Sequence, residues 1–342
     1  MDRDPQGDPS PETPASAEKR TPLEEFEARA QQTRADIEAH AQHAREEFEA
    51  QVKHARDQFD QTQEKIKART GRNLLAAIGI GVALGGVLLV SLLFYSWLFI
   101  PFAAFLVGFT VWELSTALRG AGRDVPRVVS IVVGIAVLPA AYFLHVPGLW
   151  LAVIAGIALV SLWRVGELLL RPSHRIPART VFADIGAGLF VQLYVTFLAG
   201  FYVVLAGEDG GQWWVLAALI IVVSTDVGAY AAGLSFGRHK MAPRISPGKT
   251  WEGFAGAAVV AMAAGTLLAW LMLGQPWWEG TIMGLVLMLV GTMGDLIESL
   301  IKRELGIKDI SGWLPGHGGF LDRLDSILPS AAVAYACYLI FH

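Results

Sequence analysis

The sequence has 342 residues, of which 54% are hydrophobic and 17% are charged, and its mean hydropathy is +0.46. Soluble domains carry roughly 25% charged residues, so this composition excludes an ordinary soluble domain and predicts a membrane protein. The net charge is −4, and no segment clusters Lys and Arg beside aromatic residues, which excludes a nucleic-acid-binding protein. With a single cysteine, Cys337, we expect neither an intrachain disulfide nor a cysteine metal site.

The first 70 residues form a polar arm that differs from the rest of the chain. Residues 1–21 are rich in Pro, Asp, Glu and Ser without apolar periodicity, and we expect a disordered tail. Residues 22–70 carry apolar or small side chains at near-helical spacing, which predicts a charged cytoplasmic helix. Its thin, alanine-rich apolar stripe fits a coiled coil, a helix on the membrane surface or a solvated helix, and these alternatives stay open.

From residue 71 onward, long apolar runs alternate with short polar segments. A helix needs about 20 apolar residues to cross the ~30 Å hydrocarbon layer, so these runs predict an all-α, polytopic membrane helical bundle of about nine transmembrane helices. We divide it into an N-terminal transmembrane region, 71–180, and a C-terminal transmembrane region, 181–342. The predicted spans are 73–93, 95–118, 128–145, 147–163, 181–205, 213–235, 254–274, 279–301 and 326–341.

The basic residues indicate how the bundle is oriented. With nine spans, all sixteen Lys and Arg after residue 70 fall on one side, and the opposite loops carry none. The positive-inside rule then puts the N-terminus and the basic loops in the cytoplasm, with the protein in the cell (inner or plasma) membrane. The two long polar loops, 236–252 and 302–325, both face the cytoplasm, so a site built from them would meet water-soluble substrates.

The sixth predicted span carries Asp226 and leads into the first of these loops. A carboxylate inside an apolar helix normally faces a polar cavity, a counter-charge or an ion path, so Asp226 alone also fits a transporter. Residues 246–250 read SPGKT, but residue 243 is proline where a P-loop needs glycine, and we reject that motif. A Gly-Lys-Thr turn at the start of the seventh helix remains, and the free N–H groups of a helix N-terminus favour phosphate.

The eighth predicted span concentrates polar residues on one side. Asp295, Glu298, Ser299 and Lys302 stand at i, i+3, i+4 and i+7, hence on one helical face. Asp295 or Glu298 could form a buried ion pair with Lys302, or the carboxylates could face a polar cavity. The span by itself leaves both alternatives open.

The loop after this span ends in the polar string PGHGGFLDRLD. Gly318 and Gly319 let backbone N–H groups approach a bound anion. Asp322 and Asp325 supply the hard carboxylates that Mg²⁺ takes when it is shared with substrate phosphates. The string therefore predicts a metal–phosphate site, in which His317 fits a structural loop histidine as well as a catalytic one.

These two blocks resemble the phosphatidate cytidylyltransferases (CDP-diacylglycerol synthases). The family's C-terminal pattern is met in full, and its upstream block is matched except that Val227 stands where the family often has Ser or Thr. The resemblance covers about residues 180–342. The matching positions are Asp226, Gly228, Ala229, Tyr230, Ser246, Pro247, Lys249, Thr250, Trp251, Glu252, Gly253, Ser299, Lys302, Arg303, Lys308, Asp309, Ser311, Leu314, Pro315, His317, Gly318, Gly319, Asp322, Arg323 and Asp325.

The resemblance implies transfer of a cytidylyl group from CTP to phosphatidic acid, giving CDP-diacylglycerol and pyrophosphate for phospholipid biosynthesis. It implies a membrane enzyme with Mg²⁺ as cofactor, alone or with a monovalent cation such as K⁺. A homodimer is an open alternative for the oligomeric state, which the sequence does not determine. The metal would be held by Asp295, Asp322 and Asp325. The catalytic residues would be Asp295, Asp322, Lys302 and Lys249. The substrate-binding residues would be Asp226, Ser246, Thr250, Glu252, Arg303, Lys308, Asp309, His317, Gly318, Gly319 and Arg323.

The lipid phosphate is already anionic at neutral pH, so its attack needs positioning and charge neutralisation more than a general base. A transporter is the alternative from another class, because Asp226, Asp295 and Glu298 lie in predicted spans. Inverted repeats, which many transporters have, are not evident. A nearer alternative is another CTP-using lipid enzyme, with an isoprenoid alcohol or an archaeal-type lipid phosphate as acceptor.

Overall fold

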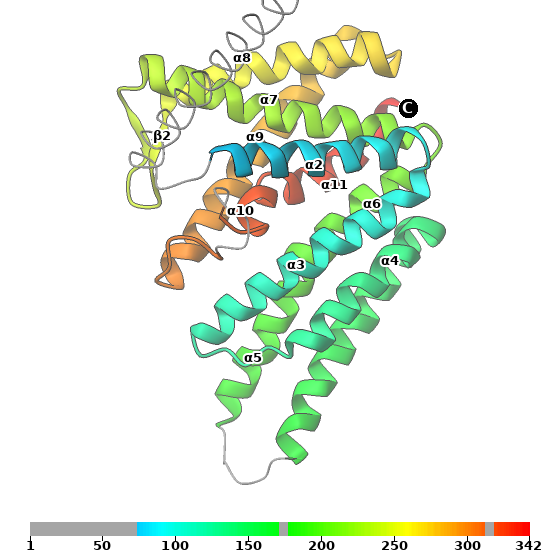
Figure 1. Ribbon diagram of the computed structural model, residues 1–342, viewed down its shortest axis with the longest axis vertical. Coiled ribbons are helices and arrows are strands. Elements are labelled where there is room, and N and C mark those ends of the chain that lie inside the picture. Colours follow the sequence, from blue (N-terminus) through cyan, green and yellow to red (C-terminus); the bar gives the residue numbers. More distant parts are fainter. Residues whose placement is uncertain (1–73, 171–176, 312–317) are drawn as a thin grey trace, which may run out of the picture. The chain divides into compact units, whose positions relative to one another are not determined.

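The computed structural model describes residues 74–170, 177–311 and 318–342, and the predicted tail 1–21, the predicted helix 22–70 and His317 lie outside them. The described residues are overwhelmingly helical, which confirms the all-α prediction (Figure 1). The predicted loop 236–252 adds a two-stranded antiparallel sheet. The elements are α2 (Leu74–Leu93), α3 (Phe99–Gly120), α4 (Arg127–Leu170), α5 (Ala178–Val191), α6 (Leu198–Gly207), α7 (Gly211–Phe236), β1 (Lys240–Ala242), β2 (Ser246–Thr250), α8 (Trp251–Leu268), α9 (Trp277–Glu304), α10 (Leu321–Leu324) and α11 (Ile327–Phe341).

Short helical turns of other types extend several of these helices. A 3₁₀ turn, Ser96–Leu98, precedes α3, and a π-helical segment, Gln192–Phe197, joins α5 to α6. A second π-helical segment, Ala269–Leu273, follows α8. Within the described residues, 7 segments are long and apolar enough to cross a membrane, which confirms a polytopic membrane protein.

The longest of these segments, α4, is a helical hairpin. At His145 the backbone has φ 52° and ψ −146°, which reverses the chain. The two arms then pack together, because a Cβ on Gly156 in the second arm would lie 2.3 Å from Val133 Cγ1 in the first. Pro147 opens the second arm, where its missing N–H is no loss. The reversal falls between the predicted spans 128–145 and 147–163, and the count of nine spans stays a prediction.

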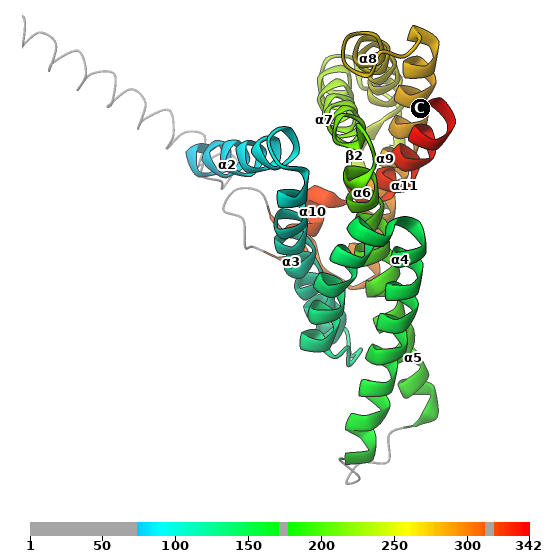
Figure 2. The same ribbon diagram turned by 90° about the vertical axis from the view of Figure 1, so that its right-hand side faces the viewer.

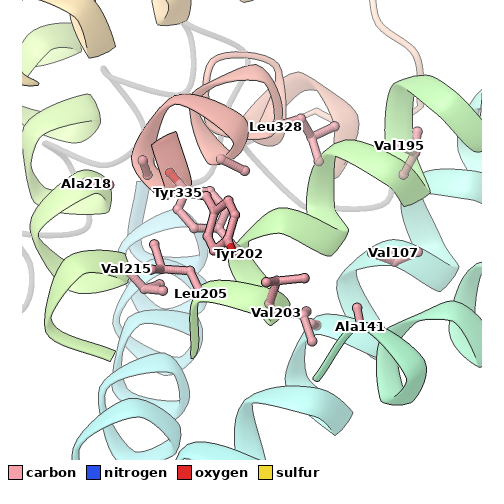
Figure 3. Packing of buried hydrophobic residues seen from close by; sticks show 14 of the residues in the cluster. Val107, Ala141, Val195, Tyr202, Val203, Leu205, Val215, Ala218, Leu328 and Tyr335 are labelled. Atoms are coloured by element: carbon pink, nitrogen blue, oxygen red, sulfur yellow. The ribbon is translucent and has the colours of Figure 1, made fainter. Parts of the chain in front are cut away.

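The apolar core is built around α6. Val203, Val204 and Leu205 are fully buried there, and α6 packs against α4, α7 and α11. Figure 3 shows Tyr202 of α6 beside Tyr335 of α11. The Tyr202 hydroxyl would be costly to bury alone, but it lies 2.9 Å from Ser330 Oγ and shares a hydrogen bond with it.

Small residues bring α7, α8 and α9 into close contact, as both ribbon views show (Figures 1 and 2). A Cβ on Gly256 of α8 would lie 2.2 Å from Ala232 Cβ of α7. A Cβ on Gly265 of α8 would lie 2.1 Å from the carbonyl oxygen of Gly280 in α9. Such glycine contacts replace hydrophobic driving force in membrane helix packing. They hold the polar faces of α7 and α9 near the loop that joins α7 to α8.

Candidate active site

A cavity of about 590 Å³, here called the polar cavity, lies between α7, α8, α9, α10 and strand β2. Segments that are far apart in the sequence therefore share one pocket, and both predicted polar loops contribute to it. Four carboxylates and two cations are part of its lining, which gives it a net negative formal charge. These residues are Asp226, Asp295, Asp322, Asp325, Lys249 and Arg323.

The β2–α8 junction positions Lys249. Thr250 is the N-cap of α8, and its Oγ1 accepts a hydrogen bond from Gly253 N at 3.1 Å. A Cβ on Gly253 would lie 2.9 Å from the Ala229 carbonyl oxygen, so this corner lies directly on α7. Lys249, the residue before the cap, reaches α9, where its Nζ lies 2.7 Å from Asp295 Oδ2. The predicted Gly-Lys-Thr turn is instead the end of strand β2.

Three carboxylates, here called the carboxylate cluster, come together in the C-terminal part of α9. Asp295, Glu298 and Asp325 each offer an oxygen, and these oxygens lie within 4.8 Å of one another. Gly294 permits this approach, because a Cβ there would lie 2.3 Å from the Asp325 carbonyl oxygen. The Glu298 side chain is only 1% exposed, and its Oε1 has no hydrogen-bond partner among the described residues. The three carboxylates therefore offer a set of oxygen donors that can hold a cation.

Lys302 neutralises part of this charge. Its Nζ lies 2.7 Å from Glu298 Oε2 and 3.0 Å from Asp322 Oδ1. Of the two ion pairs that the sequence allowed for Lys302, the structure has the one with Glu298. Asp295 pairs with Lys249 instead. Asp322, which we expected among the metal ligands, is bound to Lys302 and accepts a hydrogen bond from Gly319 N at 2.7 Å. Glu298 lies with Asp295 and Asp325 in the carboxylate cluster, and which of these carboxylates binds a metal stays a prediction.

A carboxylate from the N-terminal region contacts the segment around Gly318 and Gly319, here called the glycine-rich loop, and sequence reasoning missed it. Glu113 of α3 is 3% exposed and accepts hydrogen bonds from Leu321 N at 3.0 Å and from Ser311 Oγ. These two partners flank the loop on either side. A Cβ on Gly319 would lie 2.9 Å from Glu113 Oε2, so glycine is needed there. The available signal was a lone carboxylate inside the predicted span 95–118.

Other predicted substrate-binding residues are not in the cavity lining. Glu252 fixes the loop after α7, because its Oε2 accepts a hydrogen bond from Arg238 N at 3.1 Å and its Oε1 lies 2.6 Å from His239 Nδ1. Arg303 donates to the Ile245 carbonyl oxygen at 3.4 Å. The remaining predicted residues outside the lining are Ser246, Lys308, Asp309, Gly318 and Gly319, of which Lys308 and Asp309 are exposed.

A second buried ionic group, here called the Arg164 network, lies apart from the polar cavity lining. Arg164 of α4 is 5% exposed, and its Nη2 lies 2.7 Å from Asp184 Oδ2 in α5. Its Nη1 lies 2.7 Å from Asp124 Oδ2 and 3.4 Å from Glu167 Oε2. Asp124 N in turn donates to Asp184 Oδ1 at 3.0 Å. Every oxygen of Asp184 is thus satisfied, and the network ties α4 to α5 and to the α3–α4 connection.

Comparison with known proteins identifies the family of the chain. Residues 75–341 match the Cytidylyltransferase family. The chain is 37% identical to the phosphatidate cytidylyltransferase of Mycobacterium leprae (strain TN) over 278 residues, which is 78% of this chain and 88% of that protein. It is 42% identical to the phosphatidate cytidylyltransferase of Brucella suis biovar 1 (strain 1330) over 156 residues, which is 45% of this chain and 57% of that protein. The chain therefore belongs to the cytidylyltransferase family, as the resemblance predicted.

Proposed function

We propose that the protein is a phosphatidate cytidylyltransferase of the cell membrane. It transfers the cytidylyl group of CTP to phosphatidic acid and releases CDP-diacylglycerol and pyrophosphate. Family membership and the names of the relatives support the reaction. The observation that carries the proposal is the carboxylate cluster beside Lys249 and Arg323, at a cavity lined by the apolar helices α7, α8 and α9.

The charge of the polar cavity supports a divalent cation. The polar cavity and the adjoining Glu298 and Lys302 together carry five carboxylates and three cations, so a polyphosphate would be repelled unless another positive charge is bound. The donor set fits Mg²⁺, which prefers carboxylate oxygens and shares its remaining positions with water and substrate phosphate. Asp295, Glu298 and Asp325 would hold it, and Asp322 would act through Lys302. When bound, Mg²⁺ would neutralise charge on the phosphates as they react.

The chain's own residues would position the two substrates. Lys249, Lys302 and Arg323 would bind the anionic phosphates of CTP and of the lipid, with the N-terminus of α8 adding N–H donors. An oxygen of the lipid phosphate forms the new bond to the α-phosphorus of CTP. The bond from that phosphorus to the bridging oxygen breaks, and pyrophosphate takes both electrons. Because the attacking oxygen is already deprotonated, no residue need remove a proton.

Orientation is part of the same proposal. With the nine predicted spans, the Lys and Arg after residue 70 fall on the same side as the polar loops 236–252 and 302–325, which supports a cytoplasm-facing site with access to CTP. Reactivity of cysteines introduced at the exposed Lys308 and at the exposed Asp209 toward an impermeant reagent, in intact cells and in inverted vesicles, tests it. We expect Asp209 to be labelled in intact cells and Lys308 only in inverted vesicles. The homodimer stays a prediction.

The activity is tested with purified protein, labelled CTP and phosphatidic acid in detergent micelles. We expect labelled CDP-diacylglycerol and one pyrophosphate per product with Mg²⁺, and neither product with EDTA. Parallel reactions with isoprenoid alcohol and archaeal-type lipid phosphate acceptors identify the substrate class. Solute uptake into proteoliposomes without CTP, and no lipid product, would instead favour the transporter.

A further inference from the structure

A second cavity of about 300 Å³, here called the apolar cavity, lies between α2, α3, α6, α10 and α11. Among its lining residues, only Tyr202 and Arg323 have polar atoms in their side chains. The Tyr202 hydroxyl is hydrogen-bonded to Ser330, so its polarity is already satisfied within the protein. Cavities lined in this way stay dry and accept apolar ligands. The volume is at the lower end of the range of roughly 300–1,000 Å³ for ligand pockets.

The short helix α10 separates the two cavities. Asp322 lines the polar cavity, Phe320 and Leu324 line the apolar cavity, and Arg323 lines both. Figures 1 and 2 both show α10 beside α3, which forms another wall of the apolar cavity. An arginine suits such a boundary, because its stem is apolar and its guanidinium is charged. The polar and the apolar cavity therefore adjoin at α10, and Arg323 is in the lining of both.

We propose, as an extension that rests on the proposed function, that the apolar cavity holds an acyl chain of phosphatidic acid while the lipid phosphate lies in the polar cavity at Arg323. Phosphatidic acid is an amphiphile whose phosphate is only a few bonds from its acyl chains, so it needs adjoining compartments of this kind. The guanidinium of Arg323 matches a phosphate through paired N–H donors.

The rim of the polar cavity offers the competing place for the chain. Tyr230 and Leu234 of α7 line that cavity and are 73% and 74% exposed. Both belong to one helix, whereas side chains from several helices line the apolar cavity. Lipid tails are as apolar as either protein surface, so the free energy of moving the acyl chain out of the bilayer favours neither place. Contacts from several helices fix the position of the chain better than contacts from one, and orienting the phosphate for attack requires a fixed position.

Two adjacent glycines of α2 provide a matched pair of variants. Gly85 lines the apolar cavity, whereas Gly86 is exposed and is not part of the lining. A Cβ at either position meets no atom within 4 Å, so neither backbone position is closed to a side-chain substitution. Gly85→Phe puts a ring where we place the acyl chain, and Gly86→Phe is the same substitution one position away.

The experiment measures kcat/KM for dioleoyl and for short-chain phosphatidic acid, together with KM for CTP, in the full-length protein. We expect Gly85→Phe to lower kcat/KM for the dioleoyl lipid roughly tenfold through misplacement, and to affect the short-chain lipid less. KM for CTP should not change, and Gly86→Phe should behave like the wild type. Equal behaviour of the two variants would overturn the proposal, as would a selective loss in Leu234→Trp alone.

Photolabelling gives a second measurement that does not depend on folding of the variants. Wild-type protein is irradiated with phosphatidic acid that carries a diazirine in its acyl chain, and the labelled peptides are identified. Labels within residues 81–88 or 99–107 support the proposal, and labels confined to 230–234 overturn it. If the wild type fails to form CDP-diacylglycerol, the proposed function fails, while the labelling pattern still reports where the lipid lies.

Discussion

The carboxylate cluster and the Arg164 network are both buried ionic groups in a membrane protein, yet they differ in how completely they are neutralised. In the Arg164 network, both oxygens of Asp184 have donors, and Arg164 is surrounded by acceptors. In the carboxylate cluster, Glu298 Oε1 has no described partner, and the neighbouring cavity has more carboxylates than cations. A network whose charges are all neutralised has a structural role, whereas excess negative charge beside a cavity favours binding of a cation.

The largest effect is expected from removing charge within the cluster. Asp295→Asn should lower cytidylyl transfer on the order of 100-fold or more, because the cation site and the partner of Lys249 are lost together. Its thermal unfolding temperature should stay close to that of the wild type. The matched control is Asp209→Asn, an exposed position in the loop before α7, which should keep full activity. Equal activity of the two variants would remove Asp295 from the mechanism.

The Arg164 network should respond in the opposite way. Arg164→Met leaves Asp184 buried without its counter-charge, which costs roughly 3–5 kcal/mol of unfolding free energy. The protein that remains folded should keep its kcat. Arg119→Met is the control, because the Arg119–Asp124 pair is 41% and 45% exposed and should contribute about 1 kcal/mol or less. Stability is measured by thermal unfolding, and a large loss of kcat in the folded fraction of Arg164→Met would break the contrast.

A smaller effect is expected at Glu113, which positions the glycine-rich loop without lining the cavity. Glu113→Gln replaces one of the two accepting oxygens by an NH₂ group, which then faces either Ser311 Oγ or Leu321 N. We expect roughly a tenfold loss of kcat from misplacement of Asp322, with little change in KM for CTP. Glu167→Gln, at the exposed edge of the Arg164 network, is the same substitution and should have no effect on kcat. If both variants behave alike, Glu113 has only a structural role.

The smallest effect should come from Glu252, which orders the loop 236–252 from outside the cavity lining. Glu252→Gln retains one oxygen that can accept from the backbone of Arg238 and His239. A change of no more than about threefold in KM for CTP is expected, in line with the loss of one hydrogen bond at an accessible site. A loss as large as that of Asp295→Asn would place Glu252 in direct contact with substrate.

Much of the site followed from local spacing along the chain. One face of α9 carries Asp295 and Glu298 because a helix repeats every 3.6 residues, and the cavity lining contains both Lys249 and Asp325 from the two polar loops. Apolar run length also placed the reversal between 128–145 and 147–163, where His145 turns the chain. These features depend on neighbours in sequence, which a single sequence displays.

The pairings between helices could not be read in the same way. Lys249 rather than Lys302 meets Asp295, because glycines let α8 and α9 approach at a distance that no local pattern encodes. Glu113 reaches the glycine-rich loop across about two hundred residues of sequence, and Arg164 finds Asp184 only when α4 and α5 are packed. Which charges are neutralised depends on tertiary packing. This neutralisation distinguishes the carboxylate cluster, the candidate site, from the Arg164 network, which has a structural role.

The most direct test of this separation is the binding of Mn²⁺, which takes the same carboxylate ligands as Mg²⁺, followed by electron paramagnetic resonance in the presence and absence of CTP. We predict that the wild type binds Mn²⁺ and that Asp124→Asn, in the Arg164 network, binds it equally well. Glu298→Gln should weaken Mn²⁺ binding at least about tenfold, since it removes charge from the cluster. Equal Mn²⁺ affinity in all three proteins would contradict the account.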